Sequence, residues 1–194
     1  MEKFNEVKQN ITDEIDRYFD YAEKERLFIE GDSNTKDIYL NIKRESFLTS
    51  IHILIANKIH WFLNFSLNHK QDYINEEIKK RTAKSESIKL SELINYLNKV
   101  NKIYKIREAP NKENIERFIQ HFNSNPSFSR YDESDAKQPY SSLDAFEKIY
   151  KSRNKYAHED KIVNTLNYED LKYYKNALYN FMDDVIKILD LPIE

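Results

Sequence analysis

The chain has 194 residues, which is the length of one domain with a hydrophobic core of its own. It contains a single glycine, Gly31, where average usage predicts about a dozen. This excludes the glycine-dependent sites, namely the GxGxxG and GxxxxGK loops that hold phosphates, the GxSxG elbow and Asn-Gly hairpins. The composition therefore predicts an α-helical protein.

Charged side chains are numerous and balanced, with 31 basic and 33 acidic residues and a net charge of -2. Such a surface gives no strong electrostatic reason for bulk DNA or membrane binding. Without cysteine there is no disulfide, thiol nucleophile or thiolate-bound metal. The start of the chain is too polar for a signal peptide, and no window reaches the ~18 apolar residues of a membrane span, so we expect a cytoplasmic protein.

The first half of the chain predicts two long helices. Residues 3–29 form an amphipathic helix on the spacing of Phe4, Val7, Ile11, Ile15, Tyr18 and Ala22, and Gly31 follows as its stop. Residues 47–67 are apolar on nearly every face, which predicts a central buried helix. We expect a polar turn at 41–45 before it and its end at 69–72, with a short charged helix after that.

The second half predicts two further helices and a long loop. One helix begins near Ser87 or Ser91 and ends at Pro110, because a proline disfavours the helical conformation of the residue before it. A short helix covers residues 111–122. The stretch of about 123–141 is rich in serine and has no periodicity, which is typical of a functional or disordered loop.

The last two helices carry clear start signals. Ser141 and Asp144 resemble a capping box, and Asn167 is the expected N-cap of the final helix, which runs until Pro192. We therefore expect one all-α domain, residues 1–194, built as an up-and-down bundle of about five to six helices.

Arg153 interrupts the hydrophobic stripe of the helix that follows Ser141. At about 100° per residue the same direction is shared by Phe146, Ile149, Tyr150 and Ala157. A guanidinium is costly there unless it is paired or faces a partner. Asn154 and His158 are four residues apart and lie on one flank of the stripe.

These three residue types suit the cleavage of a phosphodiester in RNA. The imidazole of His158, with an ordinary pKa near ~6.5, can accept or donate a proton, and the guanidinium of Arg153 can hold the phosphate. Asn154 can orient either group. No carboxylate pair or histidine cluster has metal-ligand spacing, so we expect neither a metal nor a cofactor.

The stretch Arg153-Asn154-x-x-x-His158 resembles the RN-x3-H form of the R-x4–6-H motif of the HEPN superfamily of α-helical bundles. The apolar residues 47–56 also resemble the first core helix of that superfamily. The likeness covers roughly residues 36–190, and residues 1–30 are then an accessory helix. One departure is that Glu159 and Asp160 follow the histidine, where a glycine is frequent.

The resemblance implies a metal-independent endoribonuclease that acts in antiviral defence or in a toxin–antitoxin system. It implies a homodimer with the two motif helices facing each other across a composite cleft, and an antitoxin or defence protein as a further partner. Arg153 would bind the phosphate, His158 would be the acid–base group, and Asn154 would position them.

Other residues are weaker candidates for RNA contact. Lys151 and Lys155 form a local basic patch beside the motif, and Arg130 and Tyr131 lie in the long loop. His52 and His60, on the apolar helix, are interpreted as core or groove histidines.

Two alternatives stay open from the sequence alone. The first is a non-enzymatic HEPN-like module that binds a nucleotide or a protein. The second is a helical scaffold in which Arg153 pairs with an acidic neighbour and His158 sits at a helix C-terminus because the dipole favours it there.

Overall fold

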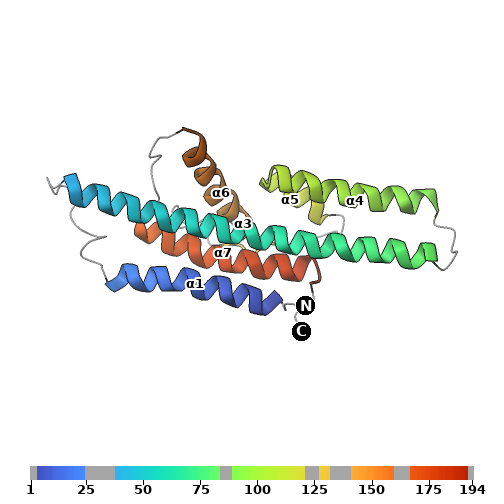
Figure 1. Ribbon diagram of the computed structural model, residues 1–194, viewed down its shortest axis with the longest axis horizontal. Coiled ribbons are helices and arrows are strands. Elements are labelled where there is room, and N and C mark those ends of the chain that lie inside the picture. The colour runs from blue at the N-terminus through green and yellow to red at the C-terminus, as the bar shows by residue number, and fades with distance from the viewer. Residues whose placement is uncertain are drawn as a thin grey trace.

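The computed structural model describes residues 4–24, 38–83, 89–120, 127–131, 141–159 and 167–191. Within these ranges the chain is an all-α bundle, as predicted, and a lone bridge between Arg130 and Ser141 is its one strand-like feature (Figure 1). Its helices are α1 (Phe4–Lys24), α3 (Ile38–Ala83), α4 (Leu90–Glu108), α5 (Lys112–Ile119), α6 (Ser142–Glu159) and α7 (Tyr168–Ile188).

Helix α3 is the centre of the bundle and contacts α1, α4, α6 and α7. Helices α1 and α7 run alongside it, α4 follows its C-terminal half, and α6 stands at a steep angle to it (Figure 1). Most of its apolar residues between Leu48 and Ile74 are buried, as the all-round hydrophobic pattern predicted, whereas Trp61 and Tyr73 are exposed.

Helix α3 is continuous over 46 residues, so the predicted turn at 41–45 and the predicted end at 69–72 are wrong. Both stretches are polar, but they contain no glycine or proline. Lysine, arginine, glutamate and glutamine are good helix formers, and polarity alone does not end a helix. The short charged helix expected after residue 72 is the last part of α3.

Helix α1 is described over Phe4–Lys24, and the rest of the predicted range 3–29 lies outside the described residues together with Gly31. Its buried face includes Phe4, Val7, Ile11, Ile15 and Ala22, as the spacing predicted. Tyr18 was assigned to the wrong face, because it is exposed and the adjacent Phe19 is buried in its place. Along one face of a helix, successive residues are three or four positions apart. The prediction continued from Ile15 by three residues to Tyr18, whereas the buried face continues by four residues to Phe19.

The predicted end of α4 and the predicted starts of α5, α6 and α7 are confirmed. Helix α4 ends before Pro110, and α5 begins after Asn111, whose side chain accepts a hydrogen bond from the Asn114 N–H. The Ser141 hydroxyl donates to the Asp144 carboxylate at 2.7 Å and accepts from the Asp144 N–H at 3.2 Å, which is the predicted capping contact. The Asn167 side chain caps α7 through the Asp170 N–H at 2.8 Å.

Asp184, on α7, is a buried carboxylate that joins three parts of the chain. It accepts hydrogen bonds from the Ser129 N–H at 2.8 Å, the Ser129 hydroxyl at 3.0 Å and the Ser142 hydroxyl at 2.5 Å. The Ser142 N–H also donates to the Ser129 carbonyl at 2.9 Å. The start of α6 and residues 127–131 are therefore anchored to α7 through one side chain.

His52, on α3, is buried and its Nε2 lies 3.3 Å from the Ile149 carbonyl oxygen of α6. Burial lowers the pKa of His52 from its ordinary value of 6.5, and the hydrogen bond to the carbonyl opposes this in part. His52 is therefore a core histidine, as predicted, and it fixes the register of α6 against α3.

We expect Asp184→Ala to lower the free energy of unfolding by about 2–4 kcal/mol, because it leaves buried N–H and O–H donors without an acceptor. Asp184→Asn keeps one acceptor oxygen and should lose less. The matched control is Asp183→Ala, which removes an exposed carboxylate paired with Lys8 and should change stability by less than about 1 kcal/mol. Equal losses in urea unfolding for Asp184→Ala and Asp183→Ala would contradict the anchor.

We also expect the protein to be less stable at pH 5 than at pH 7, in part because of His52. Since the folded-state pKa of His52 lies below the unfolded value of 6.5, its stabilising contribution is complete above that value and is lost as the pH falls below it. His52→Gln should therefore reduce the difference between unfolding free energies at the two pH values. Ser66→Ala, a buried substitution on the same helix without a titrating group, should leave that difference unchanged.

Candidate functional site

Arg153 lies on the side of α6 that packs against α3. In the two turns before it, Phe146 and Ile149 are buried and Tyr150 is half-buried, and Arg153 is itself half-buried. Its Nη1 donates to the Asn154 Oδ1 at 3.1 Å. No carboxylate among the described residues forms an ion pair with it. Arg153 therefore lies on the apolar stripe, as predicted, with the Asn154 amide as its hydrogen-bond partner among the described residues.

The other described basic residues of α6 have partners. The Lys151 ammonium lies 3.1 Å from the Glu147 carboxylate, and the Lys148 ammonium lies 5.1 Å from the centre of the Tyr174 ring. Lys151 is therefore exposed to solvent, and its charge is neutralised by the Glu147 carboxylate one turn earlier on the helix. Among the basic side chains of α6 that the structure describes, Arg153 is the one with neither a carboxylate nor an aromatic ring as its partner.

His60 lies on α3 opposite this part of α6. Its ring centre is 5.1 Å from that of Tyr150 in an edge-on arrangement, and its Nε2 is 3.2 Å from the Asn64 Nδ2. Burial lowers the pKa of His60 from its ordinary value of 6.5, and the positive charge of Arg153 lowers it further. His60 is therefore neutral at physiological pH and close enough to Arg153 to sense its charge.

Four polar side chains lie at the junction of the two helices, and we call them the α3–α6 polar cluster: Arg153, Asn154, His60 and Asn64. Arg153 carries a positive charge, and the other three side chains are neutral. One polar atom in it is left over: the Asn64 Oδ1 is buried and has no hydrogen-bond partner among the described residues. A buried acceptor without a donor is uncommon, and such atoms often mark a place where another group binds or moves. The cluster is thus incomplete as it stands.

Sequence reasoning missed His60 and Asn64 as members of this site. Both residues belong to the helix that was predicted to be apolar and buried. Their spacing in the sequence does not indicate which part of α6 they contact. One signal was present: His60 and Asn64 are four residues apart, which places them about 40° from each other on one side of a helix. Polar residues along one side of a buried helix indicate a shared polar contact.

The structure places the remaining predicted residues in two groups. The backbones of Lys155 and His158 belong to α6, and their side chains lie outside the described residues. Arg130 and Tyr131 lie at the opposite end of α6, where Arg130 bridges to Ser141. At ~1.5 Å per residue, that point is roughly 16 Å along the helix from Arg153. Arg130 and Tyr131 are therefore not brought to the α3–α6 polar cluster.

Tyr131 has a structural environment. Its hydroxyl accepts a hydrogen bond from the Asn180 amide at 2.8 Å, and its ring packs against the core. Burial raises the pKa of Tyr131 above its ordinary value, although the hydrogen bond from Asn180 opposes this. Arg130 is exposed and lines a polar hollow of about 750 Å³ with Lys112 and Asp144, which form an ion pair at 2.7 Å.

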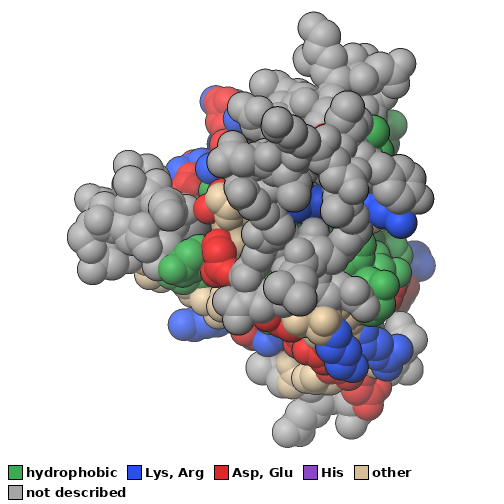
Figure 2. Space-filling view, turned by 90° about the vertical axis from the view of Figure 1, so that its left-hand side faces the viewer, with side chains coloured by type: hydrophobic (Ala, Val, Ile, Leu, Met, Phe, Trp, Pro, Cys, Tyr) green, Lys and Arg blue, Asp and Glu red, His purple; other side chains and the backbone are tan. Residues whose placement is uncertain are grey.

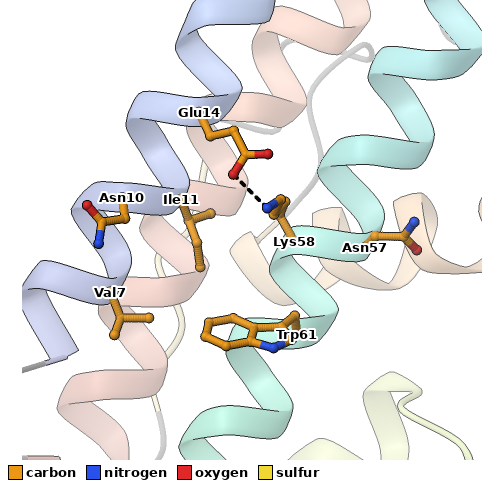
Figure 3. Close-up of a pocket in the computed structure, with 7 residues that line it drawn as sticks. All are labelled: Val7, Asn10, Ile11, Glu14, Asn57, Lys58 and Trp61. Carbon is orange, nitrogen blue, oxygen red and sulfur yellow. Dashed lines mark ion pairs between the residues drawn. The ribbon is translucent and has the colours of Figure 1, made fainter. Parts of the chain in front are cut away.

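A separate groove of about 400 Å³ lies between α1 and α3 (Figure 3). Trp61, which is 51% exposed, forms one side of the groove, and Val7 and Ile11 form the other. The charged groups in the groove are Glu14 and Lys58, whose side chains neutralise each other at 2.6 Å. The groove therefore offers apolar contact and no acid–base pair for catalysis.

On the face seen in Figure 2, no described side chains of one charge gather into a large patch. In the end view of Figure 2, acidic and basic side chains lie next to one another around small hydrophobic areas. No group of three or more histidine, aspartate and glutamate side chains among the described residues is placed to hold a metal ion. None of the described helices has a stretch both long and apolar enough to cross a bilayer.

The fold and the α3–α6 polar cluster define an all-α bundle protein with a cationic site at a helix junction. No family model, no curated protein and no solved structure matches the chain significantly. The likeness of the Arg153–His158 motif to the HEPN superfamily therefore stays a prediction from the motif.

We expect the charge of Arg153 to control the titration of His60. Arg153→Ala removes a nearby positive charge and should raise the pKa of His60 toward 6.5, whereas Arg153→Lys keeps the charge and should leave it lowered. The measurement is the pH dependence of the imidazole NMR signals, with His60 assigned from the spectrum of His60→Gln. The same His60 pKa in both Arg153 variants would contradict the proximity of the two groups.

Proposed function

We propose that the protein is a metal-independent endoribonuclease of the HEPN type. The observation that carries this proposal is the Arg153 side chain, which is half-buried at a helix junction without a carboxylate partner among the described residues and hydrogen-bonded to Asn154. A guanidinium with unused donors in a partly desolvated place is a strong ligand for a phosphate. It belongs to the same three-residue motif as His158.

The reaction is a transesterification within RNA. The 2′-oxygen of a ribose attacks the adjacent phosphorus atom, its proton passes to a base, and the bond from phosphorus to the 5′-oxygen breaks as that oxygen receives a proton. His158 is the acid–base group, since an imidazole with an ordinary pKa exchanges protons near neutral pH. Arg153 binds the phosphate and stabilises the negative charge that develops on its oxygens. Asn154 holds the guanidinium in position.

In a dimer, the α6 helices of the two protomers would together form one composite site. A two-fold axis beside the C-terminal part of α6 would bring Arg153 and His158 of one protomer opposite those of its partner. A protein with this activity would need control, so we propose a role in antiviral defence or a toxin–antitoxin system, with an antitoxin or defence protein as its regulator.

The test is cleavage of total RNA by the purified protein, with and without a chelator. Arg153→Ala and His158→Ala should each lower the cleavage rate by at least about 100-fold, which is the usual effect of removing a phosphate-stabilising or acid–base group. The chelator should have no effect on the rate. The products should carry 2′,3′-cyclic phosphate and 5′-hydroxyl ends.

The matched control is Arg117→Ala, which removes an exposed arginine of α5 paired with Glu113 and should leave cleavage unchanged. Circular dichroism of each variant checks that the helices are intact. Cleavage that persists in the double variant of Arg153 and His158 would contradict the proposal. Tight binding of a nucleotide or a protein without any RNA cleavage would favour the non-enzymatic alternative.

A further inference from the structure

We propose that His60 is a second phosphate-binding group of the Arg153 site, and that it contacts the phosphate of bound RNA in its protonated form, with Asn64 as the residue that holds it. This inference rests on the proposed function for the choice of ligand, a phosphodiester. It adds to the motif two residues from another helix, His60 and Asn64, which precede Arg153 by 93 and 89 positions.

Two contacts fix the position of His60. Its ring meets the Tyr150 ring at 5.1 Å, and its Nε2 lies 3.2 Å from the Asn64 Nδ2. Tyr150 precedes Arg153 by three residues on α6, which places both side chains on the same face of that helix. Two turns earlier on α3, His52 binds the Ile149 carbonyl and sets the position of α6. An imidazole with so few alternative positions is preorganised for a ligand that Arg153 also binds.

Charge favours an anion between these two residues. Among the described side chains of α6, Tyr150 contacts His60 and Arg153 acts on it electrostatically. The residues of α3 one turn to either side of His60 are Ala56, Asn57, Leu63 and Asn64. Burial, and to a smaller extent the charge of Arg153, thus favours the neutral form of His60 in the absence of phosphate. A phosphate bound to Arg153 reverses this effect, since its negative charge favours an imidazolium next to it. His60 then takes one proton from the solvent as the phosphate binds.

Asn64 explains how the cluster accommodates both protonation states. In the neutral imidazole Nε2 accepts a hydrogen bond from the Asn64 Nδ2, which leaves the buried Oδ1 of Asn64 without a donor. In the imidazolium Nε2 carries a proton and donates. Rotation of the amide by half a turn then gives that proton an acceptor in Oδ1. The unsatisfied oxygen in the empty site is the acceptor that the protonated state uses.

The experiment follows the His60 imidazole of the full-length protein by NMR across a pH series. The probes are a 2′-O-methyl dinucleotide, which has a phosphodiester but cannot be cleaved by transesterification, and inorganic phosphate. We expect a saturating concentration of the dinucleotide to raise the pKa of His60 by at least about half a unit, and its affinity to rise as the pH is lowered from 7.5 to 5.5. A shift with inorganic phosphate as well would identify the phosphate group itself as the ligand.

Variants separate binding by His60 from general effects of mutation. His60→Gln should weaken the binding of the dinucleotide by about tenfold at pH 5.5. It should also remove the pH dependence of the affinity, since a neutral amide cannot become a cation. Asn64→Ala should reduce the shift of the His60 pKa. The matched control is His69→Gln, which changes the histidine that packs on Phe4 elsewhere on α3 and should bind the dinucleotide like the unaltered protein.

The inference and the proposed function can fail separately. An unchanged His60 pKa at saturating dinucleotide, or equal affinity in His60→Gln and the unaltered protein, overturns the inference even if RNA is cleaved. A raised His60 pKa together with no cleavage of total RNA supports the phosphate site and overturns the endoribonuclease. The first measurement uses the unaltered protein and therefore does not depend on any variant folding.

Discussion

The carboxylate of Asp184 is the contact on which the arrangement of the site depends. It is 8% exposed, and serine donors from residues 127–131 and from the first turn of α6 complete its hydrogen bonds. A charge in such a place is tolerated because its oxygens are satisfied, and its loss would leave several donors unpaired. Asp184 holds one end of α6 on α7, while His52 holds the middle of the same helix on α3. Between them they determine where Arg153 lies.

Much of the fold could be predicted because its signals are local. The Ser141–Asp144 contact and the Asn167 cap depend on side chains three residues apart, and Pro110 ends α4 by a steric effect on its own neighbour. The continuity of α3 could not be predicted from polarity, because a polar stretch without glycine or proline forms a turn or a helix according to its packing. Residues 69–74 remain helical where Ile74 reaches the core.

The candidate site divides in the same way. Arg153 was identified from its own helix, since a basic residue on an apolar stripe is visible in the sequence. His60 and Asn64 were not, because their role depends on which turn of α3 meets which turn of α6, and that register is set by tertiary contacts such as the one between His52 and Ile149. Arg130 and Tyr131 were candidates because loops often carry function, but Tyr131 packs on the core far along α6 from Arg153.

The unbroken length of α3 has a mechanical consequence. At ~1.5 Å per residue its 46 residues span roughly 70 Å, and the sequence from 38 to 83 contains no proline or glycine at which it would bend sharply. His60 lies near the midpoint of this continuous helix. A tilt of about 5° there displaces the end of α3, some 23 residues away, by roughly 3 Å. A tilt of that size beside Arg153 would therefore be detectable as a changed spectroscopic distance at the far end of the bundle.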